Sequence, residues 1–140
     1  MKLFILISSI FFLSFQGDNS VPVKTDGFYV GKFAQEYHYI YFHADGTAET
    51  YILSVLDIKK ASSYVNNKTA SDFSGPYIVH AGNIVYRSNN SSNKTEAPAT
   101  NLFHSYQGKM NSKGQLVLWV TSTNGSKTEC TFDYYKFPNE

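Results

Sequence analysis

Apolar and polar residues alternate with a period of two along most of this chain from residue 27 onward. That period is typical of β-strands with one buried face, because successive side chains of a strand point to opposite sides. Turn sequences separate the alternating runs. The strongest are Asp45-Gly46 and Asn124-Gly125, since glycine tolerates the positive φ of tight hairpins. The pattern therefore predicts an antiparallel, all-β protein.

We expect about eight short strands, because that many alternating runs lie between turn signals. They span residues 27–33, 36–43, 47–55, 73–80, 84–87, 102–110, 115–123 and 126–137. Such strands can close into an up-and-down meander barrel, which leaves no exposed sheet edge. An open β-sandwich is the alternative architecture.

Two polar stretches interrupt the alternation. Residues 57–72 are expected to hold one short helix or loop, with Asp57 near the helix start, where a carboxylate satisfies unpaired amides. Residues 88–100 have no apolar period, and we expect them to form an exposed, mobile loop.

The N-terminus has the composition of a secretory signal peptide. Lys2 precedes an uncharged run, Leu3 to Phe15, which matches the apolar region of a signal and is too short to span a membrane. We assign the signal to residues 1–17, with cleavage between residues 16 and 20. Residues 18–140 then form one secreted or periplasmic domain without a transmembrane segment.

The charge and the cysteine content exclude some classes of partner and one source of stability. The formal net charge is +1, and it falls to about zero once Lys2 is removed, so neither nucleic acid nor an anionic membrane is an expected partner. Cys130 is the single cysteine, which excludes an intrachain disulfide. Stability must come from packing, to which 11 tyrosines and 11 phenylalanines contribute large areas.

Alternation also assigns the faces of the strands. In the last strand the charged residues must face water, so the residues between them point inward. In residues 36–43, Ile40 and Phe42 are the more apolar pair, and their face is placed inside. The predicted lining of the barrel interior is His38, Ile40, Phe42, His104, Tyr106, Phe132 and Tyr134. Tyr37, Tyr39 and Tyr41 then form an outward row.

Four segments of the chain resemble lipocalin-like (calycin-like) small secreted proteins, particularly short bacterial ones. They are "YIYFHADGTA", "FSGPYIVHAGNIVYR", "SYQGKMNSKGQLVLWV" and "NGSKTECTFDYYKF". The likeness covers most of residues 27 to 137. It implies a binding barrel and gives no indication of catalysis.

Two functions follow as hypotheses. The first is a carrier or sensor for a small hydrophobic or aromatic ligand, with His38 and His104 as polar contacts among the inward rings. The second is a protein-interaction module, such as an inhibitor or a cell-surface binder, that uses the outward tyrosines and Trp119. The alternative to the first is that the rings fill the barrel. The alternative to the second is that the outward rings only pack across strands.

No pattern in the chain indicates an enzyme or a cofactor. Glu49, Glu129 and Asp133 have the alternation of solvent-facing strand residues, and no nucleophile motif surrounds Cys130. A metal site is not expected, because His38 and His43 are an odd number apart and face opposite sides of one strand. Five asparagines begin Asn-x-Ser/Thr, as glycan sites in a eukaryote or as polar loop residues in a bacterium: Asn67, Asn89, Asn90, Asn93 and Asn124.

Overall fold

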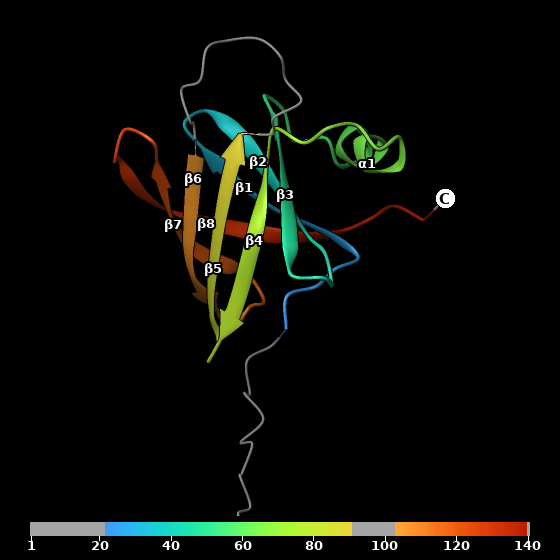
Figure 1. Cartoon of the computed structure of the whole chain (residues 1–140). Helices are drawn as coiled ribbons and strands as arrows, with labels where there is room; N and C mark the ends of the chain where they lie inside the picture. Colours follow the sequence, from blue (N-terminus) through green and yellow to red (C-terminus); the bar gives the residue numbers. More distant parts are fainter. Residues whose placement is uncertain (1–21, 91–102, 140) are drawn as a thin grey trace, which may run out of the picture.

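The computed structural model describes residues 22–90 and 103–139, in which eight antiparallel strands form a closed barrel (Figure 1). Each strand pairs with its neighbours in sequence, and β8 pairs with β1 to close the ring. The strands are β1 (Gly27–Phe33), β2 (Glu36–Phe42), β3 (Thr47–Leu53), β4 (Phe73–His80), β5 (Asn83–Asn90), β6 (Phe103–Met110), β7 (Leu116–Ser122) and β8 (Lys127–Lys136). This topology confirms the predicted meander barrel over the alternative sandwich.

The strand positions agree closely with the alternation, and β5 differs most. β5 extends to Asn90, whereas the sequence predicted a loop from residue 88. Ser88 instead pairs with His104 of β6 and is fully buried, so backbone pairing continues the strand where apolar alternation has ended. Residues 91–100 of the expected loop and the expected signal peptide at residues 1–17 lie outside the described residues.

The expected helix is present between β3 and β4. α1 spans Ile58–Asn66, and Asp57 is its N-cap, whose Oδ1 accepts a hydrogen bond of 2.9 Å from the backbone N–H of Lys60. Among the described residues, none of the helical segments has the length and apolar character needed to cross a membrane.

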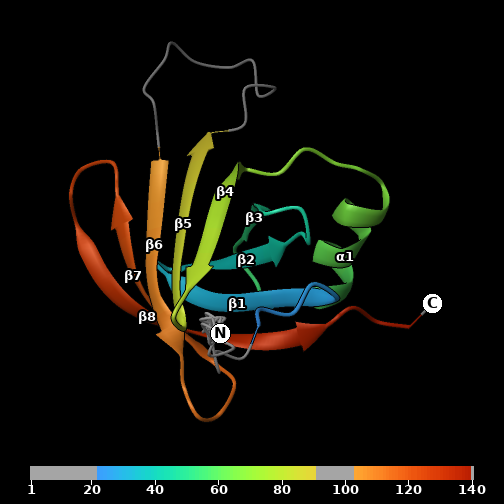
Figure 2. The ribbon, with the colours of Figure 1, turned by 60° about the horizontal axis from the view of Figure 1, so that its bottom comes forward.

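Two separate hydrophobic cores stabilise the fold. The first fills the barrel and contains the inward residues of the strands: Tyr29, Ile40, Phe42, Ala48, Ile84, Tyr86, Tyr106, Leu116, Leu118, Val120, Cys130 and Phe132. The second lies outside the barrel, where α1 stands beside β1, β2 and β3 (Figure 2). Its buried members are Phe28, Val30, Tyr39, Tyr51 and Ala61.

The second core covers the predicted row of outward tyrosines. These side chains do point away from the barrel interior, but Tyr39 has no exposed surface, and Tyr37 and Tyr41 are partly buried. Phe137, beyond β8, packs edge-on against Tyr41 with ring centroids 5.1 Å apart. The expectation that Tyr39 forms part of an open interaction surface is therefore wrong, because the helix and the C-terminal segment cover it.

Candidate ligand site at one end of the barrel

Aromatic rings in mutual contact occupy the end of the barrel at which β1 begins. The ring centroid of Tyr29 lies 5.7 Å from that of Phe42 and 5.2 Å from that of Tyr134. Phe42 also meets Tyr77 edge-on at 4.8 Å. The hydroxyl of Tyr134 donates to the carboxylate of Asp26, which ties β8 to the segment before β1. Phe42 and Tyr134 therefore serve packing at this end.

The middle of the barrel holds a second layer of rings. Tyr106 stacks on Tyr86 with centroids 5.2 Å apart, and it meets Phe132 edge-on at 6.1 Å. The hydroxyl of Tyr86 shares a hydrogen bond of 2.9 Å with that of Thr50. Gly31 lies under the Phe132 ring, where an added Cβ would come within 2.8 Å of a ring carbon. Phe132 can occupy this space because residue 31 has no side chain.

The opposite end of the barrel brings two histidines together. His38 of β2 and His104 of β6 are 66 residues apart in sequence, yet their ring centroids lie 5.4 Å apart with the rings nearly perpendicular. Nδ1 of His38 shares a hydrogen bond of 2.9 Å with the hydroxyl of Tyr106. This bond fixes the His38 ring against the middle layer.

Two phenylalanines complete this end. Phe73 meets His104 edge-on at a centroid distance of 4.6 Å, and Phe33 lies 5.3 Å from His38 and 6.0 Å from His104. His104 and Phe33 are partly exposed, whereas His38 and Phe73 are buried, so the group borders the mouth of the barrel. We call Phe33, His38, Phe73 and His104 the mouth cluster.

One polar atom of the mouth cluster is unsatisfied. Nδ1 of His104 is buried and has no hydrogen-bond partner among the described residues, although the backbone carbonyl of His104 accepts a bond of 3.0 Å from Ser88 Oγ. Buried polar atoms in folded proteins are nearly always paired, and leaving one unpaired costs about 1–3 kcal/mol. A bound molecule would remove that cost if its polar group reached Nδ1 after the side chains that cover this atom had moved aside.

Both imidazoles of the mouth cluster are uncharged near neutral pH. Burial, together with the neighbouring His104, lowers the pKa of His38 to about 4, against a smaller opposing effect of Asp72. Burial also lowers the pKa of His104. Within the ranges described, no three His, Cys, Asp or Glu side chains come together to hold a metal ion.

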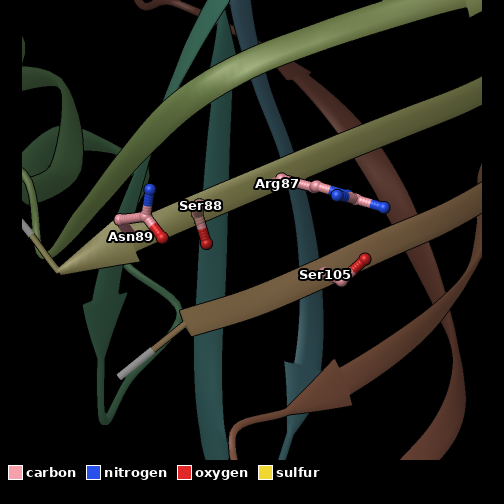
Figure 3. Close-up of a pocket in the computed structure, with 4 residues that line it drawn as sticks. All are labelled: Arg87, Ser88, Asn89 and Ser105. Carbon is pink, nitrogen blue, oxygen red and sulfur yellow. The ribbon is translucent and has the colours of Figure 1, made fainter. Parts of the chain in front are cut away.

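A hollow lies beside β5 and β6. It has a volume of about 430 Å³ and is lined by Arg87, Ser88 and Asn89 of β5 and Ser105 of β6 (Figure 3). Arg87 and Asn89 are exposed, and Ser88 is buried. The four residues that the structure describes around this hollow are all of polar type, whereas the predicted ligand calls for aromatic or aliphatic side chains.

The sequence-predicted interior residues thus divide into three levels. His38 and His104 meet at the mouth end. Ile40, Tyr106 and Phe132 belong to the middle of the barrel core, where Tyr106 is bonded to His38, and Phe42 and Tyr134 lie at the far end. Sequence reasoning did not include Phe33 and Phe73 in the site. The signal that could have found them is strand alternation, because Phe33 lies on the same face of its strand as Gly31, and Phe73 lies on the same face as Tyr77.

Comparisons of the chain with protein-family models, with curated proteins and with solved structures found no match. The closed eight-stranded meander is compatible with a lipocalin-like barrel. The function proposed for the protein is therefore based on the geometry of the mouth cluster.

Proposed function

We propose that this protein is a secreted or periplasmic, non-catalytic binding protein that takes one small, mostly apolar ligand at the mouth cluster. The observation that carries the proposal is the unpaired, buried Nδ1 of His104 among aromatic rings. Sites for small molecules combine apolar walls with a few placed polar groups, and this end of the barrel has both. The interior of an eight-stranded barrel can be filled by the protein's own side chains, or it can hold one small ligand.

The proposal locates the ligand at the mouth and not deep in the barrel. Tyr106 and Phe132 are fully buried and in contact across the middle layer, so they form the floor of the site. Tyr106 also holds His38 from below, which orients that imidazole without occupying the mouth. The sequence-predicted contacts His38, His104 and Tyr106 are the ones that we retain as ligand-binding residues.

Two substitutions on β4 test this location. N-phenyl-1-naphthylamine, a neutral apolar probe that fluoresces when desolvated, should bind the wild-type protein. Phe73→Leu removes a ring from the mouth cluster and should weaken binding up to about tenfold, the equivalent of one lost aromatic contact. Tyr77→Leu removes a ring from the same strand at the far end and should leave affinity within about twofold.

Fluorescence titration of the three purified proteins measures these affinities. Absence of binding to the wild-type protein, together with a native mass spectrum without bound material, would remove the proposed function. Equal weakening by both substitutions would place the ligand elsewhere.

A second candidate function is binding of a protein partner by the uncovered outer face of β4 to β8. Ile78 and Trp119 are 66% and 43% exposed, and cross-strand pairing joins them in one row through Val85 and Gln107. Tyr and Trp are enriched at binding hot spots, and exposed apolar patches often mark interfaces. Trp119 is separated from the tyrosine row by β1 and β8, so this surface differs from the one that the sequence suggested.

Replacing both exposed side chains tests the second candidate. The double variant Ile78→Ser, Trp119→Ser should change the free energy of unfolding by no more than about 1 kcal/mol, because neither side chain belongs to a core. If this face binds a partner, the immobilised wild-type protein should retain an extracellular protein that the double variant loses. Identical retention by both proteins would eliminate this surface.

A further inference from the structure

We infer that the ligand of the mouth cluster is a neutral, flat aromatic molecule with one hydroxyl group, which hydrogen-bonds to Nδ1 of His104. The inference rests on the proposed function and narrows its ligand class. Three features of the described residues support it: the geometry of the rings, the one unpaired polar atom that is buried in the mouth cluster, and the absence of a charged side chain among the buried residues.

The rings of the mouth cluster favour a flat aromatic ligand. Phe33, Phe73 and His38 all approach the His104 ring nearly perpendicular to it, with interplanar angles of 88° in each case. Edge-to-face contact is a favoured arrangement of aromatic groups, and a planar ligand can continue it at the partly exposed side of Phe33 and His104. An aliphatic chain would gain only the area that it buries.

The unpaired Nδ1 of His104 favours one hydroxyl group, which reaches this buried atom once the side chains that cover it move aside. Nδ1 of His38 is already bonded to Tyr106, and Thr50 is bonded to Tyr86, so these groups have partners within the protein. Nδ1 of His104 is left, and in a neutral imidazole it either donates or accepts, depending on the tautomer. A hydroxyl can do both, so it matches Nδ1 in either tautomer.

The electrostatics of this end disfavour a charged ligand. Neither imidazole carries a charge near neutral pH, and Asp72, the carboxylate that influences the pKa of His38, accepts a hydrogen bond of 2.8 Å from the backbone N–H of Ile52. Among the buried residues that the structure describes there is no Lys, Arg, Asp or Glu side chain. A buried ligand charge would therefore lose hydration without gaining a paired ion.

A matched series of naphthalene compounds tests the inference at pH 7.5 by calorimetry or competition with the fluorescent probe. The series is 2-naphthol, naphthalene, 2-naphthoate and 2-naphthylmethylammonium, which share one ring system and differ in the polar group. The wild-type protein should bind 2-naphthol about tenfold more tightly than naphthalene, and both ions more weakly than either. His104→Phe retains a ring but removes Nδ1, and it should bring 2-naphthol and naphthalene within about twofold of each other.

The outcomes separate the two levels of the argument. Binding of naphthalene or of either ion as tightly as 2-naphthol overturns the ligand class and leaves the proposed function standing. Failure of the whole series and of the fluorescent probe to bind overturns both. If His104→Phe does not fold, the comparison of the four compounds on the wild-type protein decides the inference without it.

Discussion

Replacing Tyr39 with alanine should destabilise the protein by about 3–5 kcal/mol, which is the range for deleting a large buried aromatic side chain. Tyr39 has no exposed surface and lies in the second core, where it meets Phe28 edge-on at 5.7 Å. Its hydroxyl donates to the carbonyl of Val55 and accepts from the N–H of Asp57, both at 2.7 Å. The side chain therefore anchors the start of α1 to the outer face of β2.

Urea unfolding followed by circular dichroism measures this loss. Tyr39→Phe keeps the ring and should cost about 1–3 kcal/mol, the penalty for unpairing the two backbone groups. Tyr37→Ala, on the same strand face but only partly buried, provides the positional control and should cost less than Tyr39→Ala. If Tyr39→Ala were as stable as the wild-type protein, the conclusion that α1 and the C-terminal segment bury Tyr39 would be wrong.

Lowering the pH from 7 to 4.5 should destabilise the protein by about 2–3 kcal/mol through His38 alone. The pKa of this imidazole is about 4 in the folded protein, mainly because of burial, and 6.5 is its ordinary value. Between these two values the unfolded chain binds a proton that the folded protein excludes. Stability is therefore lost as the pH falls from 6.5 towards 4, and the loss levels off below the folded pKa. His104, whose pKa is also lowered by burial, acts in the same direction.

Two glutamine variants identify the histidine that is responsible. His38→Gln should flatten the dependence of unfolding free energy on pH in the window from 7 to 4.5. His43→Gln should not flatten it, because His43 lies on the outer face, where Nε2 is 2.9 Å from Glu49 Oε2. The exposed carboxylates Asp26 and Asp45 have lowered pKa values and act below this window. A slope as steep in His38→Gln as in the wild-type protein would show that His38 is not responsible, and a wild-type stability that does not fall between pH 6.5 and 4.5 would show that the mouth end is hydrated.

The strands, their faces and the helix could be predicted because each depends on local pattern. Period-two alternation places Ile40 and Phe42 inside, and a carboxylate before a short polar stretch marks the helix start at Asp57. The second core could not be predicted in the same way. Alternation shows that Tyr39 faces outward, but the cover comes from α1 and from Phe137, which reach it only through long-range packing.

The candidate site was predictable only in part for a similar reason. The pattern places His38 and His104 inside, but their contact depends on the curvature of the barrel, because β2 and β6 are not neighbouring strands. Cross-strand register likewise determines that Phe73 and not Phe42 shares their level. Residues with the same inward direction can therefore lie at opposite ends of one interior.

The most direct test of the ligand site at the mouth cluster is a long-range ¹H–¹⁵N NMR spectrum of the imidazole nitrogens during titration with 2-naphthol. The account predicts that the Nδ1 resonance of His104 shifts and saturates, with a smaller change at His38. His43 and His80, which lie outside the barrel interior, provide the internal reference and should not move. A His104 resonance that stays unchanged at a saturating concentration of 2-naphthol would contradict the account.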